Sequence, residues 1–314
     1  MIYVIGSINT DISFEVERIP KKGETIIADS CKTGLGGKGA NQAVAIARLA
    51  RQYDDGRRAV KLIGQVGKDS FGTELVSKLD GYGVDTEFVR QVNRGTGVSV
   101  LAATGKDDRM IVYSGANLGI SKSDVDEALS SARSTDTLLC QLEVPTYIVG
   151  YALRKAHSLG MTTILNPAPA KELPPDFYPN IDIIIANEIE TQTLTDINPK
   201  DWINRHEAMS EFHRRGVRYV VLTLGADGAT FSDNGALVGQ IPAREVRVTD
   251  TTAAGDALVG ALALTYPHIG MYSFKEAALF ATKAASITIS RRGGVDSIPS
   301  FEEVSALYFN EIKI

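Results

Sequence analysis

The chain has 314 residues, of which 44% are hydrophobic and 23% are charged. Both fractions are near the averages of globular proteins, which excludes a disordered, fibrous or low-complexity chain. Lysine and arginine total 33 and the acidic residues total 38, so the net charge of −5 provides no basic field for nucleic acids or anionic membranes. We therefore expect no nucleic-acid partner and no membrane partner.

The cysteines and the N-terminal segment indicate the cellular compartment. Cys31 and Cys140 form no CxxC pair and lie near no cluster of histidines, which argues against a disulfide framework and against a zinc site. The N-terminus lacks the cationic segment of a signal peptide, and no apolar run approaches the roughly 18 residues that span a bilayer. We expect a cytoplasmic protein.

Short apolar runs rich in β-branched residues recur along the chain and are typical of buried strands. They lie at Tyr3–Ile5, Val60–Ile63, Leu138–Leu142, Thr162–Leu165, Ile181–Ala186 and Tyr219–Leu224. Helical patterns lie between several of them, and Ser121 with Asp124 predicts a capping box at the start of one helix. This alternation predicts an α/β fold whose mostly parallel sheet is covered by helices on both faces.

Two stretches, about 12–33 and about 97–113, break this alternation. Both alternate apolar and polar residues without helical spacing, and Gly105–Asp108 has the composition of a hairpin turn. The pattern fits a small secondary sheet and fits equally a pair of edge hairpins that only cover the core. A charged segment over 52–58 is interpreted as a surface loop.

The first candidate for chemistry is the glycine-rich run 34–41. Three of its glycines have GxGxxG spacing, but residues 29–33 before it make a poor strand for a dinucleotide-binding fold. A P-loop also fails, because Lys38 is followed by Gly39 where Ser or Thr would bind magnesium. The run is therefore either a structural turn or a loop whose backbone approaches a ligand before a helix that begins near Gln42.

The second candidate is the segment 250–256 before an apolar helix. Small side chains at Ala253, Ala254 and Gly255 leave backbone N–H groups bare at the helix start, which creates a site for an anion such as a transferring phosphoryl group. Asp256 in the same turn is either a functional carboxylate or an acid that only stabilises the helix.

Two further polar segments follow predicted strands directly. Residues 187–190 follow the strand at 181–186, and residues 223–228 lie at the end of the strand at 219–224. Ligands of open α/β sheets gather at the carboxyl ends of the strands, so we expect both segments to face one crevice.

Several segments together resemble the ribokinase branch of the PfkB carbohydrate kinases. The matching segments are 6–11, 36–45, 141–143, 166–170, 187–190, 250–256 and 293–299. They run in the family's order over nearly the whole chain, and the paired GGKGANQA and DTTAAGD signatures are highly specific.

The resemblance implies a single ribokinase-like domain over residues 1–314, with three layers, a mainly parallel central sheet and a small β lid from about 12–33 and 97–113. It implies phosphoryl transfer from ATP to the 5-hydroxyl of D-ribose, giving ribose 5-phosphate and ADP. Alternatives within the family are kinases of deoxyribose, of a different sugar or of a nucleoside. A third hypothesis is a non-catalytic sugar or nucleotide sensor.

The resemblance also assigns roles to residues. Asp256 would take the proton from the attacking hydroxyl, and the backbone of Ala253, Ala254 and Gly255 would stabilise the transferring phosphate. The implied sugar-binding residues are Asn9, Asp11, Gly36, Gly37, Lys38, Asn41, Glu143 and Asp256. The implied ATP-binding residues are Asn187, Thr223, Gly225, Ala226, Gly228, Gly255 and Thr282.

Metal ions and self-association complete the expectations from the resemblance. Glu190 would organise Mg²⁺ through water. A potassium ion would be held by Asp250, Thr252, Thr288, Arg291, Gly293 and Ser297, in a low-charge oxygen cage suited to a monovalent cation; without this cage, Asp250 would only cap a turn. Apolar side chains at Ile12–Val16 and Val98–Ala102 are expected on an exposed face of the lid, and the resemblance suggests a homodimer through that lid.

Overall fold

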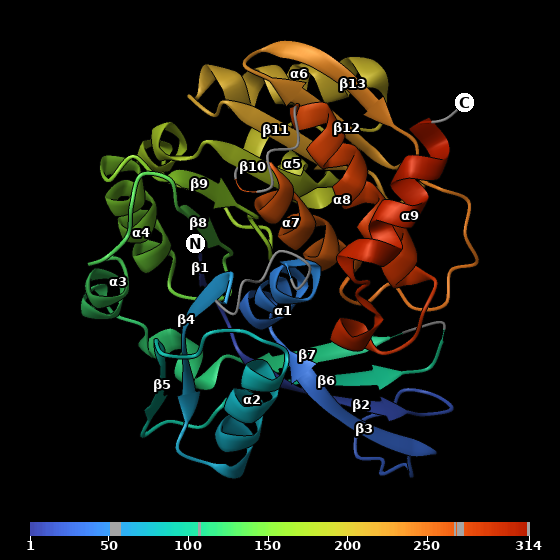
Figure 1. Ribbon diagram of the computed structural model, residues 1–314. Helices are drawn as coiled ribbons and strands as arrows, with labels where there is room; N and C mark the ends of the chain where they lie inside the picture. Colours follow the sequence, from blue (N-terminus) through green and yellow to red (C-terminus); the bar gives the residue numbers. More distant parts are fainter. Residues whose placement is uncertain (51–57, 106–107, 267, 269–272, 313–314) are drawn as a thin grey trace.

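Nine strands form the large sheet of the computed structural model, which describes residues 1–50, 58–105, 108–266, 268 and 273–312 (Figure 1). In sequence order the strands are β1 (Ile2–Ile5), β4 (Val60–Gly67), β5 (Val89–Val92), β8 (Thr137–Cys140), β9 (Thr162–Leu165), β10 (Ile183–Asn187), β11 (Tyr219–Thr223), β12 (Ala229–Asp233) and β13 (Ala236–Ile241). Their order across the sheet is β13-β12-β11-β10-β9-β8-β1-β4-β5. Among the described strand pairs of this sheet, only β11–β12 and β12–β13 are antiparallel. All six runs predicted as strands lie in this sheet, so the prediction is confirmed.

Helices cover both faces of the large sheet because successive side chains of a strand point to opposite sides. In β1, Ile2 and Val4 face one core, whereas Tyr3 and Ile5 face the other. The first core packs against α1 (Lys38–Ala50), α2 (Ser70–Gly81), α7 (Ala254–Thr265), α8 (Phe274–Ile289) and α9 (Phe301–Ile312). The second packs against α3 (Lys122–Ala128), α4 (Thr146–Ser158), α5 (Glu188–Thr195) and α6 (Trp202–Arg214). The predicted three layers are therefore present.

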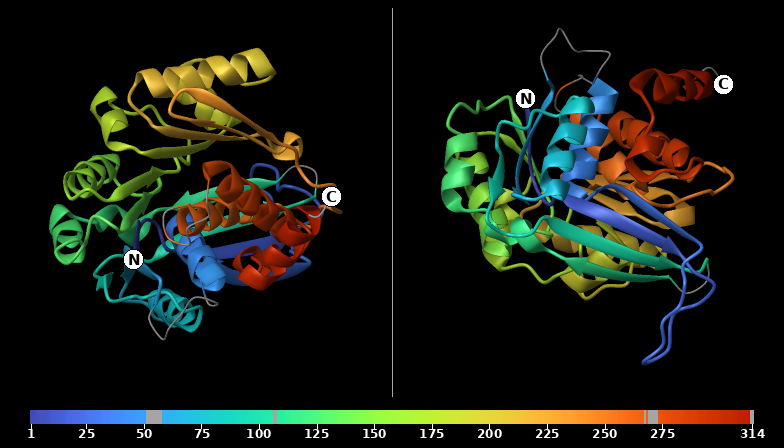
Figure 2. Two further views of the ribbon diagram at one scale, coloured as in Figure 1. Left: turned by 45° about the horizontal axis from the view of Figure 1, so that its top comes forward. Right: turned by 90° about the horizontal axis from the view of Figure 1, so that it is seen from below.

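The two irregular stretches form a second sheet, here called the small sheet. It contains β2 (Asn9–Glu15), β3 (Ser30–Gly36), β6 (Gly97–Ala103) and β7 (Arg109–Tyr113), in the order β3-β2-β6-β7. Strands β2 and β6 pair in parallel, so the stretches form one sheet rather than two separate hairpins. Figures 1 and 2 place it beside α1 and α2, at the opposite end of the molecule from α6.

The structure also tests the expectations for the cap of α3, the strand before the glycine-rich run and the membrane-spanning segments. Ser121 and Asp124 form the predicted capping box at the start of α3. The poor strand at 30–33 is in fact part of β3, an edge strand whose side chains are mostly exposed. Residues 51–57 and 106–107, which include most of the expected surface loop and the centre of the expected hairpin turn, lie outside the described residues. In the part of the chain that is described, no helix has both the length and the apolar character needed to cross a membrane.

Candidate active site

Helix α7 begins without a capping side chain. Ala253 precedes the helix with a φ of 62°, and no described side chain bonds to the first backbone N–H groups. The N–H of Ala254 donates to the carbonyl of Thr251 at 3.3 Å. A Cβ placed on Gly255 would meet nothing within 4 Å, so the first turn borders open space. The start of α7 therefore has the features of an anion site.

Asp256, in that first turn, is buried and held by two amides of α1. Asn41 Nδ2 donates to Asp256 Oδ2 at 2.9 Å, and Gln42 Nε2 donates to Asp256 Oδ1 at 2.9 Å. Burial raises the pKa of Asp256, while the charge of Lys38 and the two amide hydrogen bonds oppose this rise. A carboxylate with a raised pKa beside an anion site is suited to accept a proton.

The start of α1 is bonded to residues that are distant in the sequence. The backbone N–H of Lys38 donates to Glu143 Oε2 at 3.0 Å, and Ser7 Oγ donates to the same oxygen at 2.5 Å. Gly37 turns the chain from β3 into the helix with a φ of +88°. The helix consequently begins at Lys38, and the prediction of a start near Gln42 is wrong, because these caps come from other loops.

Asp11 lies on the small sheet and faces the same region. A Cβ on Gly36 would lie 2.1 Å from its carboxyl atoms, so any larger residue there would displace the Asp11 carboxylate. Burial and the charge of Glu143 raise the pKa of Asp11 to about 6, although a hydrogen bond from Ser99 lowers it. The charge of Asp256 also acts on Asp11, which places the three carboxylates around one region.

A cavity of about 200 Å³ brings together residues from separate loops. It is lined by Lys38, Asn166, Ala168, Ile185, Asn187, Glu190, Thr223, Thr251, Ala253, Gly255, Asp256 and Val259. Burial lowers the pKa of Lys38, but the charges of Asp256, Glu143 and Glu190 more than compensate, and its pKa is raised. Lys38 is therefore a cation under the influence of three carboxylates. Because it lines the cavity, its positive charge can also attract phosphate.

Asn187 and Glu190 form a capping box at the start of α5. Asn187 Oδ1 accepts from the backbone N–H of Glu190 at 2.8 Å, and the Glu190 carboxylate accepts from the backbone N–H and side-chain amide of Asn187 at 2.9 and 3.0 Å. Burial raises the pKa of Glu190, with Lys38 opposing this rise. Because both carboxylate oxygens already accept hydrogen bonds, the site fits a magnesium ion held through water.

Four of the residues expected to bind the nucleotide lie at the end of β11 and in the turn that follows it. Thr223 ends β11, Gly225 and Ala226 lie in the 3₁₀ turn η4 (Gly225–Asp227), and Gly228 follows it. Thr282 lies apart from them in α8, where its hydroxyl donates to the carbonyl of Ala278 at 2.9 Å, and it does not line the cavity.

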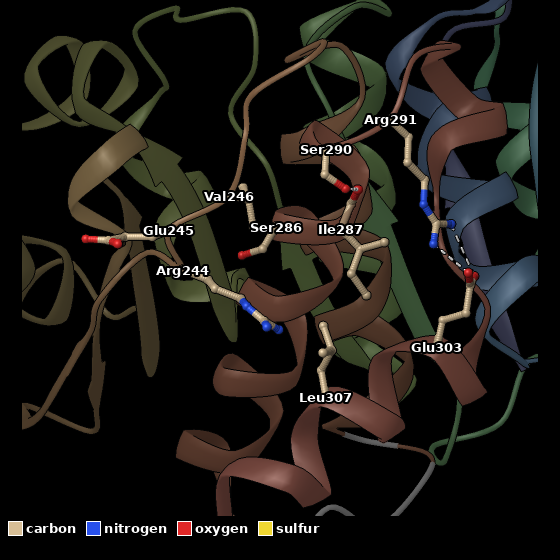
Figure 3. A pocket seen from close by; sticks show the side chains of 9 residues that line it. All are labelled: Arg244, Glu245, Val246, Ser286, Ile287, Ser290, Arg291, Glu303 and Leu307. Atoms are coloured by element: carbon tan, nitrogen blue, oxygen red, sulfur yellow. Dashed lines mark hydrogen bonds and ion pairs between the residues drawn. The ribbon is translucent and has the colours of Figure 1, made fainter.

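Two of the expected potassium ligands, Thr252 and Gly293, bond to the carboxylate of Asp250. Its Oδ1 accepts from the N–H of Thr252 at 2.9 Å, and its Oδ2 accepts from the N–H of Gly293 at 3.4 Å. Burial raises the pKa of Asp250, but these and neighbouring hydrogen bonds outweigh burial and lower it. The guanidinium of Arg291 pairs with Glu303 at 2.5 Å, which leaves its carbonyl as the group to offer a cation (Figure 3).

The remaining members of this set supply neutral oxygens. Thr288 Oγ1 donates to the carbonyl of Ala284 at 2.9 Å, and Ser297 Oγ donates to the carbonyl of Gly294 at 2.7 Å. Within the described residues, no three His, Cys, Asp or Glu side chains are grouped as metal ligands. One carboxylate among neutral oxygens fits a monovalent cation better than a divalent one.

A second, larger cavity of about 430 Å³ lies between segment 244–246 and helices α8 and α9 (Figure 3). It is lined by Arg244, Glu245, Val246, Ser286, Ile287, Ser290, Arg291, Glu303 and Leu307. Of the residues singled out in the sequence, only Arg291 lines it. Cavity size alone would therefore have selected a different location from the one that the carboxylates and the bare helix start indicate.

Sequence reasoning assigned no role to several residues that hold the site. Gln42 bonds Asp256 directly, and its place beside Asn41 in the glycine-rich run was the one signal that could have found it. Asn117 Nδ2 donates to Asn9 Oδ1 at 2.7 Å, and Asn117 Oδ1 accepts from the N–H of Ile8 at 2.9 Å. Asn117 belongs to no motif, so nothing in the sequence points to this contact.

Comparisons with known proteins agree with the geometry. The pfkB family of carbohydrate kinases matches residues 1–300. A ribokinase of Schizosaccharomyces pombe is 36% identical over 98% of this chain and 97% of its own length. A deoxyribokinase of Salmonella typhi is 31% identical over 99% of this chain and 97% of its own. The structure of Arabidopsis thaliana ribokinase complexed with ribose and ATP matches with a TM-score of 0.88, at 31% identity and over 98% of each chain. This chain therefore belongs to the pfkB family of carbohydrate kinases.

Proposed function

We propose that the protein transfers the terminal phosphoryl group of ATP to the 5-hydroxyl of D-ribose. The observation that carries the proposal is the buried carboxylate of Asp256 in the uncapped first turn of α7. A base and an anion site in one turn are what phosphoryl transfer to a hydroxyl requires. Relatives named ribokinase over nearly the whole chain, one of them complexed with ribose and ATP, supply the identity of the acceptor.

In the proposed reaction, the 5-oxygen of ribose forms a bond to the γ-phosphorus while the bond between this phosphorus and the β,γ-bridging oxygen breaks. ADP leaves with that electron pair, and the hydroxyl proton passes to Asp256. The backbone N–H groups of Ala254 and Gly255 stabilise the charge on the transferring group. Lys38 adds a positive charge on the same cavity.

Binding of the sugar is proposed to depend on polar side chains near Asp256. Asp11, Asn41 and Glu143 present carboxylate and amide groups that can pair with vicinal hydroxyls. Ala226, Gly228 and Thr282 are proposed, with Thr223 and Gly225, to accommodate the nucleotide. Asn9, Gly36 and Gly37 shape the sugar side through their backbone and close packing.

Two metal ions are part of the proposal. Magnesium neutralises phosphate charge when it is bound, and Asn187 with Glu190 would hold it through water. Potassium adds a positive charge beside the anion site when it is bound, and the set around Asp250 would hold it. We expect kcat to rise when potassium is added to a tetramethylammonium buffer at constant ionic strength; an unchanged rate would contradict the potassium assignment.

A second acceptor, 2-deoxyribose, is favoured by the 31% identity to a deoxyribokinase. The test is an ATP assay over a panel of pentoses, hexoses and nucleosides, with the phosphorylated product identified by mass and ³¹P NMR. Loss of one hydroxyl would leave a buried partner unpaired, at a cost of about 1–3 kcal/mol, so ribose should have the larger kcat/KM. Equal values for the two sugars would reject the ribose assignment, and no phosphorylated sugar at all would reject the proposed reaction.

We also propose a cytoplasmic homodimer that associates through the small sheet. The stretches Ile12–Val16 and Val98–Ala102, which were expected to be exposed, are mostly half-buried. The exposed apolar side chains of the small sheet lie on its edge strand β7. Met110, Ile111, Val112 and Tyr113 are 64%, 72%, 51% and 56% exposed. Such an edge favours pairing with a second copy. Light scattering should give twice the chain mass at micromolar concentration, and Ile111→Lys should give the monomer mass; a wild-type monomer would contradict the proposal.

A further inference from the structure

Gln42 is fully buried in the first half of α1 and has no role in the reaction described so far. Its Nε2 donates to Asp256 Oδ1 at 2.9 Å and to Asn166 Oδ1 at 3.0 Å. Its Oε1 accepts from Gln141 Nε2 at 2.6 Å. The amide therefore connects the carboxylate of α7 with residues that follow two strands of the large sheet, without itself lining the cavity.

The orientation of this amide is fixed by a backbone carbonyl. Asn166 Nδ2 donates to the carbonyl of Ile185 in β10 at 2.9 Å. A carbonyl oxygen can only accept, so the amide oxygen of Asn166 must face Gln42. That oxygen needs a donor, which requires Nε2 of Gln42 on the side of Asn166 and Asp256. A flipped Gln42 would place its oxygen against two other oxygens in a buried site.

The fixed orientation of Gln42 affects Asp256. The two carboxylate oxygens of Asp256 accept hydrogen bonds from two residues that differ in whether they are proposed to bind the sugar. Oδ2 accepts from Asn41, which is also proposed to hold the sugar. Oδ1 accepts from Gln42, whose amide has no part in substrate binding. Hydrogen bonds to a carboxylate favour its charged form, and two bonds from fixed amides also hold its plane in one orientation.

We propose that Gln42 is a positioning residue for phosphoryl transfer, which orients the carboxylate of Asp256 and preserves its charge in the buried site. The proposal rests on the proposed function only in that Asp256 receives the hydroxyl proton. It does not depend on which sugar is the acceptor. Gln42 acts through Asp256 and does not touch the reacting groups.

The test compares Gln42→Met with Gln141→Met in the full-length protein. Both replace a buried amide by an apolar side chain of similar size, but only the first removes a donor to Asp256. Gln141 is a suitable control because its own Oε1 has no hydrogen-bond partner among the described residues, and because Asn166 still orients Gln42. Both variants are assayed with the best acceptor of the sugar panel, so failure of the ribose assignment does not affect the result.

The readout is the pH profile of kcat/KM for the sugar, together with the KM for ATP and thermal unfolding. For Gln42→Met we expect kcat to fall by roughly 10–100-fold, the KM for ATP to stay within about threefold, and the acid limb to move up by about one pH unit. Gln141→Met should keep kcat within about threefold and leave the acid limb in place. A uniform loss of kcat for Gln42→Met with an unshifted acid limb would overturn the proposal, as would an equal shift in both variants.

A second substitution keeps the proposal testable if Gln42→Met does not fold. Gln42→Glu retains the shape of the side chain but replaces the donor by a carboxyl group beside Asp256. Like charges at this distance raise each other's pKa, so its acid limb should move further than one pH unit. An acid limb at the wild-type position in this variant would overturn the proposal.

Discussion

Two helices, α1 and α7, begin at the same site but treat their first backbone N–H groups differently. At the start of α1, Lys38 and Gly39 bond to Glu143 and Ser7, at 3.0 and 3.5 Å. At the start of α7 no described side chain is a cap, and the space beside Gly255 is open. The start of α1 is thus bonded to residues distant in the sequence, whereas the start of α7 has, among the described residues, only the local bond from Ala254 to Thr251 and is available to a ligand.

This difference assigns separate roles to the two helix starts: the start of α1 holds the site together, and the start of α7 is left free to bind phosphate. The bonds at α1 hold the loops after β1 and β8 against the helix, which keeps Asn41 and Gln42 in reach of Asp256. The bare start of α7 carries the partial positive charge of the helix dipole into the cavity. If α7 stabilises the transferring phosphate and α1 holds the base, substitutions in the two helices should have different effects.

The largest effect is expected at the carboxylate itself. Asp256→Asn should lower kcat by roughly 10²–10⁴-fold through loss of the base, with little change in the KM for ATP. Asp124→Asn is the matched control, since Asp124 is also a buried acid in the first turn of a helix and lies in a capping box of α3. It should lower the thermal stability and leave kcat unchanged. Near-normal turnover in a folded Asp256→Asn protein would mean that Asp256 only stabilises α7.

A smaller effect is expected when the bare start of α7 is filled. Gly255→Ala adds a methyl group where the protein itself offers no obstacle, so the fold should keep or slightly raise its melting temperature. The same methyl group would intrude on the phosphate, and we expect kcat/KM for ATP to fall by roughly 10–100-fold. Gly81→Ala is the control, because its Cβ also meets nothing within 4 Å, at the end of α2. Equal activities of the two variants would remove the anion site from the account.

The next effect concerns pH and the sugar side of the site. Because the pKa of Asp11 is raised to about 6, its carboxylate becomes protonated as the pH falls through 6. The KM for ribose should then rise about tenfold per pH unit below 6, and Asp11→Asn should abolish this dependence. The stability of the sugar-free protein should depend on pH in the opposite sense to sugar binding. Because the pKa of Asp11 is raised in the folded state, its contribution to the free energy of unfolding declines as the pH rises from about 4 to 6. A KM for ribose that is flat between pH 7.5 and 5 would contradict the role of Asp11.

The smallest effects separate two side-chain caps. Asn187→Ala and Ser121→Ala each break a capping box, in α5 and α3, and each should cost about 1 kcal/mol in the free energy of unfolding. Only Asn187 lines the cavity, so only its substitution should also raise the KM for MgATP, by a few-fold. Denaturant unfolding and steady-state kinetics on the same samples decide this, and a matching change in KM for Ser121→Ala would count against the assignment.

The architecture was largely predictable because its signals are local. Buried strands such as β10 and β11 are short apolar runs, and the cap of α3 depends on two residues three positions apart. Asp256 in the first turn of α7 also follows from a local pattern of small residues before an apolar helix. The convergence of the strand-end loops follows from the parallel sheet.

The contacts that hold the site were not predictable, because their partners are far apart in the chain. Glu143 and Lys38 are separated by 105 positions, and Gln42 and Asp256 by 214. Local patterns therefore misplace the start of α1 and give Gln42 no role. The alternation of apolar and polar residues identifies a strand but not its place in the sheet. An exposed apolar face was therefore expected at Ile12–Val16 and Val98–Ala102, whereas the most exposed apolar side chains of the small sheet lie on edge strand β7.

The contrast between the two helix starts is tested most directly by a crystal structure of the protein with ADP, ribose and aluminium fluoride. We predict that the aluminium fluoride, which takes the place of the transferring phosphoryl group, lies against the backbone N–H groups of Ala254 and Gly255. The ribose 5-oxygen should lie within about 3 Å of Asp256. The bonds from Lys38 and Ser7 to Glu143 should be unchanged. A fluoride group at the start of α1, or a ribose 5-oxygen remote from Asp256, would contradict the account.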